Sequence, residues 1–478
     1  MTETKIEHPS LTERKAHGKD LRKRIAQSSH AGWAPAADRP DPVALLEQQD
    51  ATREADLVPV RHGRMLVSPF TFYRGAAKIM AADLKDTPRA GLTAQLCGDA
   101  HLSNFGIFAS PERALMFDLN DFDETLPGPF EYDVKRMSAS FTIAARNNGF
   151  TQVEAHDITQ TSVRAYREAM IDFAQMRTMD IWYAHLSETE LMSGLDALLS
   201  AQKGKAQKKE MQKGVAAAKK AAVKARTRDS LQALSKLAEH VDGNYRIVSQ
   251  PPIVIPAREL AATAGLSADE LQHMVHEQFR AYRSTLQDDR RHLLEQFEVV
   301  DMARKVVGVG SVGTRAFIVL LQGRDQEDPL FLQVKEATAS VLEDHLPKSR
   351  FKQPGERVVQ GQRMMQAASD IYLGWTKGVE ANRFLYWRQL RDMKMSADVE
   401  SLRPLGLTFY AEKCGWTLAR AHARSGDPVA IAGYLGKSDA FDVAVTDFSE
   451  RYADQNDKDF EAFAAAIKSG RIEAVEGL

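Results

Sequence analysis

The side chains best suited to catalysis lie between residues 97 and 124. Asp99 stands in the segment CGDAHLSNFG with Asn104 five positions after it, and Asp121 and Asp123 follow in the segment NDFDE. Amide and carboxylate oxygens suit Mg²⁺, which binds one or two carboxylates together with substrate phosphates. We therefore expect Asn104, Asp121 and Asp123 to hold Mg²⁺, and Asp99 to orient or deprotonate an attacking hydroxyl.

Turn formation is the structural alternative for these acids, because Gly-Asp and Asn-Asp pairs commonly form turns. The combination of a Gly-Asp-x-His-x-x-Asn loop with an Asp-Phe-Asp loop favours function over that alternative. His101 belongs to the first loop and is a second catalytic candidate, although a hydrogen bond that braces the loop is the favoured role for it.

A glycine-rich segment forms a second candidate group far later in the chain. Gly308, Gly310, Ser311 and Gly313 belong to GVGSVG, which fits the pattern G-x-G-x-x-G. In a dinucleotide site these glycines open a helix, whereas here the apolar, β-branched run 314–322 predicts a strand. A glycine turn between two strands is typical of backbone amides that cover nucleotide phosphates.

Lys335 ends the next predicted strand, within LFLQVKEA, and is expected to neutralise phosphate charge. The alternative is an exposed lysine at a strand end. The helix that follows should supply a carboxylate to hold the ammonium. We choose Glu356 for this role, with Glu343 and Glu336 as close competitors.

Short strands must position both groups. The first β region is predicted as strands at 93–97, 104–108 and 114–119, followed by a helix at 129–146. The second is predicted as strands at 305–309, 314–322 and 329–334, a helix at 356–371 and a strand at 383–390. Helices are predicted at 70–84, over almost all of 151–297, and from 409 onward, after an irregular arm with short helices at 1–60. This pattern predicts the α+β fold class.

Composition narrows the class of protein. The 478 residues are 44% hydrophobic and 27% charged, which is typical of a globular chain. The 63 Lys and Arg against 65 Asp and Glu argue against a nucleic-acid partner, and the basic run 203–228 is interpreted as a solvated helix. Two cysteines exclude a disulfide framework. Without an apolar run of about 18 residues or a signal peptide, we expect no membrane partner and a cytoplasmic location.

The acidic segments carry a resemblance to a known class of enzyme. GDAHLSN followed by DLNDFDE resembles the catalytic and metal loops of aminoglycoside-phosphotransferase-type kinases, whose pattern is HGDxHxxN and then DFxD. In protein kinases the catalytic Asp likewise precedes the metal-binding Asn by five residues. GPFEYDVKRMSAS (128–140) resembles a further family segment, which puts Asp133 where a buried Asp braces the catalytic loop. Two features depart from the pattern: Cys97 replaces the leading His, and the Asp after Gly128 is missing.

The order of the segments differs from that of these kinases, in which the glycine loop precedes the catalytic loop. CGWTLARAHARSG (414–426) resembles the L-A-x-x-H helix that comes just before the catalytic loop, and RFLYWRQLRD (383–392) resembles the strand and hinge between two lobes. We therefore expect a circularly permuted, protein-kinase-like, two-lobed fold. It requires 419–423 to pack beside the loop at Asp99, and Asp121 to lie within about 15 Å of Lys335 if both are to serve one nucleotide.

The wider sequence, including RMLVSPFTFYRGAA (64–77), resembles the bacterial domain-of-unknown-function family 2252 over nearly its entire length. Arg74 in this segment is either a phosphate or acceptor contact or a brace for an acidic loop. The expected domains are an N-terminal arm and helix (1–90), the catalytic and metal loops (91–150), a large helical insertion (151–300), a small nucleotide-binding lobe (301–395) and C-terminal helices that complete the large lobe (396–478).

Together the residues and the resemblance imply an ATP- and Mg²⁺-dependent phosphotransferase that acts on an acceptor of unknown identity. AMP transfer and a non-catalytic, nucleotide-binding pseudokinase are alternatives. Metal-dependent phosphoester hydrolysis is less favoured, because it needs two metals about 3.5–4 Å apart with further His and Asn ligands, and no G-N-H-[DE] segment occurs.

Overall fold

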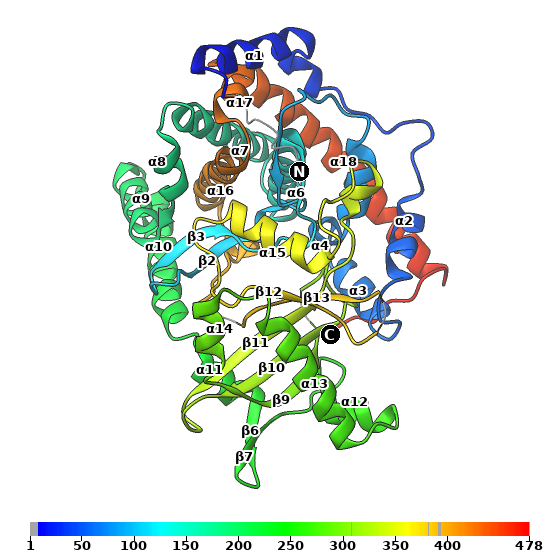
Figure 1. Ribbon diagram of the computed structural model, residues 1–478. Coiled ribbons are helices and arrows are strands. Elements are labelled where there is room, and N and C mark those ends of the chain that lie inside the picture. The colour runs from blue at the N-terminus through cyan, green and yellow to red at the C-terminus, as the bar shows by residue number, and fades with distance from the viewer. Residues whose placement is uncertain (1–7, 307, 381, 391–392, 478) are drawn as a thin grey trace.

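The computed structural model describes residues 8–306, 308–380, 382–390 and 393–477. In Figure 1 helices gather around α6 in the upper part, and an antiparallel six-stranded sheet forms the lower part. This combination confirms the predicted α+β class. None of the helices in the described ranges has both the length and the apolar character needed to cross a bilayer.

Five α-helices form the N-terminal region, and three of them begin with a side-chain cap. Ser10 and Ser68 form capping boxes, and Asp41 caps a helix that begins with Pro42. The single helix predicted over 70–84 is divided instead, because the carbonyl of Gly75 accepts a hydrogen bond from buried Arg61 (2.9 Å). The helices are α1 (Leu11–Arg24), α2 (Pro42–Asp50), α3 (Val58–Met65), α4 (Pro69–Gly75) and α5 (Ala77–Leu84).

The predicted acidic hairpin and its helix are present. Strand β2 pairs with β3 and strand β1 pairs with β4, both antiparallel. Helix α6 follows directly and is buried from Phe130 to Ala145, as expected for a helix packed on all sides. Its neighbours include α4 and the later helices α7, α16 and α18. The bounds are β1 (Thr93–Leu96), β2 (Phe105–Ala109), β3 (Leu115–Leu119), β4 (Leu126–Pro129) and α6 (Phe130–Asn147).

The middle region contains strands as well as the predicted helices. The segment AEHVDGNYRI forms a hairpin because Asp242 (φ 51°) and Gly243 (φ 83°) adopt the left-handed conformation of a tight turn. Its helices are α7 (Gln152–Phe173), α8 (Thr178–Tyr183), α9 (Glu188–Ala201), α10 (Lys205–Arg226), α11 (Ser230–Leu237), α12 (Ala257–Thr263), α13 (Ala268–Arg283) and α14 (Asp288–Leu294). Its strands are β5 (Leu186–Ser187), β6 (Ala238–Val241), β7 (Asn244–Ile247) and β8 (Val254–Pro256).

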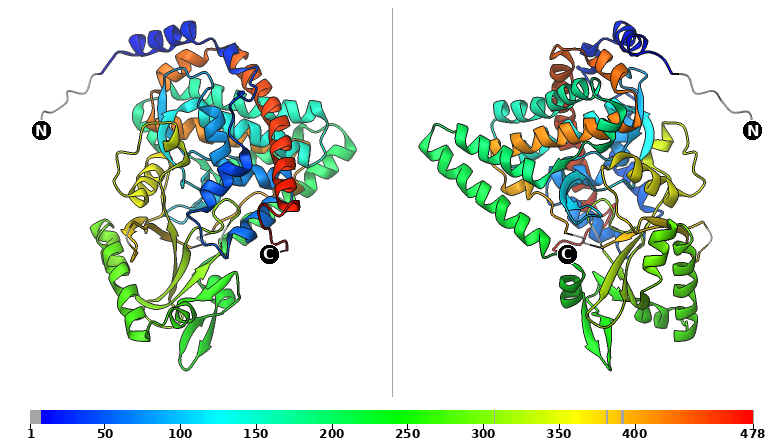
Figure 2. Two further views of the ribbon diagram at one scale, coloured as in Figure 1. Left: turned by 90° about the vertical axis from the view of Figure 1, so that its right-hand side faces the viewer. Right: turned by 60° about the vertical axis from the view of Figure 1, so that its left-hand side comes forward.

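The basic run lies mainly on α10, which packs against α9 and extends with it away from the body (Figure 2). Met211, Val215, Ala222 and Ala225 are buried on one face. The lysines of this helix are exposed, and Lys219 pairs with Asp196 of α9 (2.9 Å). This exposed, partly ion-paired face fits the predicted solvated helix.

The six-stranded sheet has the strand order β12-β13-β11-β10-β9-β8. The predicted strand at 305–309 is wrong, because pairing with β10 ends at Arg304 and with β8 at Lys305, and the chain then enters the glycine turn. The predicted strand and hinge at 383–392 is strand β13 as far as it is described, and residues 391 and 392 lie outside the described residues. The elements are β9 (Glu298–Lys305), β10 (Ala316–Gln322), β11 (Pro329–Glu336), α15 (Pro354–Met365), β12 (Gly374–Lys377) and β13 (Phe384–Gln389).

The C-terminal region returns to helix, as predicted, in α16 (Pro404–Ser425), α17 (Pro428–Leu435) and α18 (Ala440–Lys468). Helix α16 packs along α7 and touches β1. The N–H of Gln95 donates to the hydroxyl of Ser425 (3.1 Å). The end of α16 therefore lies next to the strand that leads into the Asp99 loop.

Candidate functional site

The loop after β1 carries Asp99, His101 and Asn104 and is shaped by its own backbone. Gly98 has a φ of 83°, and a Cβ there would lie 2.2 Å from the carbonyl oxygen of Glu124. The side-chain amide of Asn104 donates to the carbonyl oxygen of Asp99 (2.6 Å). The Asn104 N–H donates to the carbonyl oxygen of His101 (2.8 Å). The amide oxygen of Asn104 is thereby left available for another ligand.

Asp133 of α6 anchors this loop from behind. Its carboxylate accepts hydrogen bonds from the N–H groups of Cys97 (2.8 Å) and Gly98 (3.0 Å). His422 of α16 places Nε2 3.3 Å from the same carboxylate and Nδ1 2.9 Å from the hydroxyl of Tyr166. The predicted bracing by Asp133 and the predicted packing of the L-A-x-x-H helix beside the loop are both confirmed.

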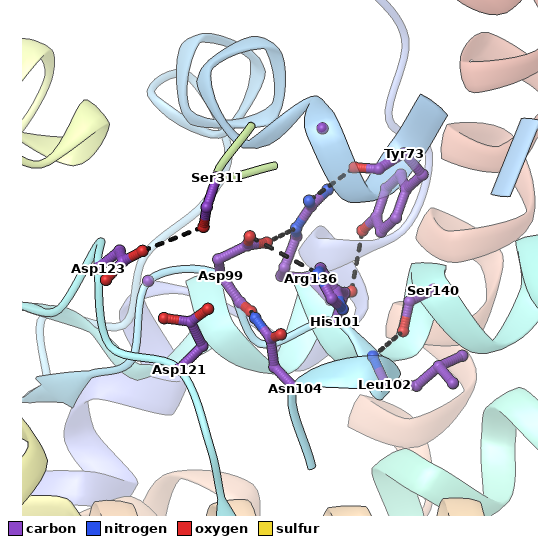
Figure 3. Close-up of polar contacts among 12 residues, drawn as sticks. Tyr73, Asp99, His101, Leu102, Asn104, Asp121, Asp123, Arg136, Ser140 and Ser311 are labelled. Atoms are coloured by element: carbon purple, nitrogen blue, oxygen red, sulfur yellow. Dashed lines mark hydrogen bonds and ion pairs between the residues drawn. The ribbon is translucent and has the colours of Figure 1, made fainter. Parts of the chain in front are cut away.

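Arg136, one turn further along α6, holds the Asp99 side chain (Figure 3). Its Nε donates to Asp99 Oδ1 (2.8 Å), and its guanidinium lies 3.8 Å from the centroid of the Tyr73 ring. His101 places Nε2 3.7 Å from Asp99 Oδ2, which is too long for a hydrogen bond. Burial lowers the pKa of His101 to about 3, so the imidazole is neutral at physiological pH. Its geometry suits packing against Asp99 better than proton donation.

Asp121 follows the end of β3 and lies beside Asn104 (Figure 3). Its Oδ1 is buried and accepts no hydrogen bond from a described residue, although Nζ of Lys335 lies 3.7 Å away. Burial would raise the pKa of Asp121, but Lys335 and two neighbouring cations outweigh burial and lower it. A buried carboxylate oxygen without a hydrogen bond fits a hard cation, and Asn104 lines the same cavity.

This pair does not form a complete metal cage. Among the described residues, no group of three or more His, Cys, Asp or Glu side chains is arranged to hold a metal ion. A cation bound by Asn104 and Asp121 would therefore complete its shell with water and substrate oxygens, as Mg²⁺ does at nucleotide sites.

Asp123 differs from Asp121, because both of its carboxylate oxygens already have partners. Oδ1 accepts a hydrogen bond from the hydroxyl of Tyr386 (2.6 Å). Oδ2 forms an ion pair with Lys335 and accepts a bond from the hydroxyl of Ser311 (3.3 Å). Asp121 is therefore the better placed of the two for a metal, and Asp123 links the lysine to the glycine turn.

Lys335 is 2% exposed and lies on β11, where it pairs in register with Ala316 of β10 and Tyr386 of β13. Burial favours the neutral amine, but Asp121 and Asp123 reverse this effect and raise the pKa of Lys335. The interpretation as an exposed strand-end lysine is wrong, because the ammonium is enclosed between the sheet and the acidic loop.

The prediction that Glu356 holds the ammonium of Lys335 is wrong. In the described part of the chain, the ion pairs of Lys335 go to Asp121 and Asp123 and none goes to Glu356. Helix α15 instead directs Arg357 toward the acidic loop, where it donates to the carbonyl oxygens of Asp123 (2.8 Å) and Thr125 (2.6 Å). Helix α15 therefore contributes a cation to the acidic loop rather than a carboxylate to Lys335.

The two competitors of Glu356 are paired elsewhere. Glu336 lies 2.8 Å from a guanidinium nitrogen of Arg383. Glu343 lies 3.9 Å from Nε of Arg357. Among the described residues, the carboxylates that hold Lys335 therefore come from the acidic loop.

The glycine turn connects β9 to β10, as predicted. Gly308 (φ 67°) and Gly313 (φ 87°) adopt the left-handed conformation that favours glycine. A Cβ at Gly310 would lie 3.1 Å from the carbonyl oxygen of Arg74, so the turn packs closely on the end of α4. The N–H of Glu54 donates to the carbonyl oxygen of Gly313 (2.7 Å). The N-terminal region thus fixes the turn over the acidic loop.

A cavity of about 430 Å³ opens where the turn, the acidic loop and the N-terminal region meet. Most of the predicted site residues line this cavity. The exceptions are Gly313, Lys335 and Glu356. Lys335 reaches the cavity wall through its contacts with Asp121 and Asp123. The structure therefore brings together two groups of residues that are far apart in the sequence.

Sequence reasoning missed several residues of this site. Arg53 lines the cavity, although it belongs to a stretch predicted as irregular. Tyr386 contacts Asp123 from β13. Arg136 follows Asp133 by three positions on α6, a spacing that puts both on one helical face and signals a shared role.

Comparison with protein families identifies the chain's relatives. The model of a family described as an uncharacterized protein conserved in bacteria (DUF2252) matches residues 53–466. The chain belongs to this family. The matched range of DUF2252 includes every site residue from Arg53 to His422. Neither the curated proteins nor the solved structures that were compared gave a match.

Proposed function

We propose that this DUF2252 protein is an ATP- and Mg²⁺-dependent phosphotransferase with a protein-kinase-like architecture. One observation carries the proposal: Nζ of Lys335 lies 3.7 Å from Oδ1 of Asp121, beside a cavity that Asp99 and the glycine turn also line. Phosphoryl transfer relies on positioning and on charge stabilisation by a lysine, metal ions and backbone amides. These are the groups that converge here.

The small-lobe interpretation is supported by the order of elements from β9 to β13. Strand, glycine turn, strand, lysine-bearing strand, helix α15 and two further strands follow one another, and all five strands belong to one antiparallel sheet. In kinases the glycine loop and the strand lysine have this arrangement. We therefore propose residues 301–395 as the nucleotide-binding lobe.

The proposed circular permutation is supported by the other half of the chain. The Asp99 loop, Asp133 and His422 meet at one point, although His422 lies far beyond the sheet in the sequence. We propose that 91–150 and 396–478 together form the large lobe, with 1–90 as an N-terminal arm. The segment 151–300, expected as a helical insertion of that lobe, is divided, because β8 belongs to the six-stranded sheet and α11, α12 and α13 pack against it. In this scheme the L-A-x-x-H helix precedes the catalytic loop in space but not along the chain.

Each site residue then has a role that its contacts allow. Asn104 and Asp121 would hold Mg²⁺, which when bound would neutralise charge on the nucleotide phosphates. Lys335 and the backbone amides of the glycine turn would bind phosphate oxygens. Asp99 would orient the acceptor hydroxyl and take its proton through Oδ2, since Arg136 occupies Oδ1.

The test uses ATP labelled in the γ- or the α-phosphate, a metabolite library, and the full-length protein with and without Mg²⁺. We expect Mg²⁺-dependent transfer of the γ label; transfer of the α label would identify AMP transfer instead. Asp99→Asn should lower transfer by about 10²–10⁴-fold and leave ATP affinity within about twofold. Asp344→Asn, at a cavity-lining acid paired with Lys78 (2.9 Å), is the matched control. A wild-type protein that does not bind Mg²⁺-ATP would refute the proposal.

A further inference from the structure

Most acids that line the cavity already have a cation. Asp99 pairs with Arg136, Asp123 with Lys335, Glu336 with Arg383 and Asp344 with Lys78. The negative charge of the cavity is therefore largely compensated within the protein. A cation that lines the same cavity without such a partner is available for a ligand.

Arg74, at the end of α4, is such a cation. It lines the cavity, its Nε is buried without a hydrogen bond, and no side-chain hydrogen bond or ion pair joins it to another described residue. A guanidinium keeps its charge in a protein. The cost of burying it is only partly offset by attraction to the charges of Asp99 and Glu400, and a bound anion would remove the remaining cost.

Arg53 adds a second guanidinium from the same N-terminal region. Its side chain is 6% exposed, lines the cavity and donates through Nη1 to the carbonyl oxygen of Val312. Its Nε donates no hydrogen bond to a described residue, and its ion pair with Asp50 is long (3.5 Å) and shared with Arg61. Two arginines whose Nε groups have no acceptor among the described residues therefore line one cavity.

We propose that Arg74, assisted by Arg53, binds an oxyanion in this cavity, so that a substrate held there carries a phosphate-like group near Asp99. This inference deepens the proposed function and rests on it for the role of Asp99. Guanidinium groups suit such a ligand because their planar fork can donate two parallel hydrogen bonds. The oxyanion is either an acidic group of the acceptor or the terminal phosphate of the nucleotide.

Calorimetric titration of inorganic phosphate into the full-length protein tests the site. Arg74→Gln should weaken phosphate binding by at least about tenfold, which corresponds to about 1.4 kcal/mol. Lys78→Gln is the matched control, because Lys78 lines the same cavity but is already paired with Asp344; it should change affinity by less than about twofold. Should Arg74→Gln fail to fold, Arg53→Gln is expected to weaken binding by at least about threefold.

Repeating the titration with saturating Mg²⁺ and a non-hydrolysable ATP analogue distinguishes the two sources. Simultaneous binding supports an acidic group on the acceptor, and mutual exclusion supports the terminal phosphate. A wild-type protein that does not bind phosphate, or equal affinities in wild type and the folded arginine variant, would overturn the inference. Arg74-dependent phosphate binding without ATP binding would support the anion site and refute the proposed phosphotransferase.

Discussion

Lys335 of β11 and Asp121 of the loop after β3 approach to 3.7 Å, measured from Nζ to Oδ1. They belong to segments that are far apart in the sequence, and the predicted limit for a shared nucleotide was about 15 Å. The spatial requirement of the sequence interpretation is therefore met. The same contact makes Lys335 a link between the sheet and the acidic loop.

Replacing Lys335 with methionine tests the role of its charge while keeping a side chain of similar length on β11. Lys335→Met should keep the strand intact but lower turnover by about 10²–10³-fold, because a donor aimed at developing phosphate charge is lost. ATP affinity should fall as well, as measured by calorimetry. Lys377→Met, at an exposed position of β12, should leave both quantities unchanged. Normal turnover in Lys335→Met would contradict the phosphate role.

Asp121 and Asp123 should respond differently to removal of charge. Asp121→Asn should raise the Mg²⁺ concentration needed for half-maximal nucleotide binding by at least about tenfold, since it removes a carboxylate ligand. Asp123→Asn should affect the Mg²⁺ requirement less, because Asp123 is committed to Lys335, Tyr386 and Ser311. Titration of Mg²⁺ at fixed ATP measures both. Equal shifts would show that the two acids share the metal.

Asp133 should matter for stability as well as for activity. Asp133→Ala leaves the N–H groups of Cys97 and Gly98 buried without acceptors, at about 1–3 kcal/mol for each. We expect a large fall in the free energy of unfolding, measured with urea. His156→Gln removes a partly exposed pair with Glu450 and should cost about 0–1 kcal/mol. A loss in Asp133→Ala as small as this control would contradict the bracing role.

Buried His30 predicts a pH dependence of stability. Its Nε2 lies 2.7 Å from the hydroxyl of Tyr434, and burial lowers the pKa of His30 to about 3. In the unfolded chain the imidazole binds a proton below about pH 6.5. Because the unfolded state then binds more protons, stability should decrease as pH falls from about 6.5 toward 3.

The variant His30→Gln should reduce this dependence. Melting temperatures between about pH 7.5 and 4.5 should fall less steeply than in the wild type, because one of the groups that protonates on unfolding is gone. His17→Gln changes an exposed histidine of α1 and serves as the control. If the melting temperature of His30→Gln depended on pH as steeply as that of the wild type, other groups would govern the loss of stability at low pH.

Local patterns in the sequence predicted much of the sheet and the acidic hairpin, because alternating apolar residues and glycine turns act over a few positions. The hairpin at Asp242-Gly243 carried such a signal and was missed. The partner of Lys335 could not be predicted, since several glutamates follow it in the sequence and only tertiary packing selects Asp121 and Asp123. The unpaired state of Arg74 likewise depends on contacts that no local pattern encodes.

The contact between Asp133 and His422 has a consequence for folding during translation. Domains fold as their residues leave the ribosome, from the N-terminal end onward. The acidic loop emerges early, but its last brace appears only after the sheet and most of the C-terminal region have been made. A chain that ends prematurely before residue 422 would therefore keep its acidic loop without that brace.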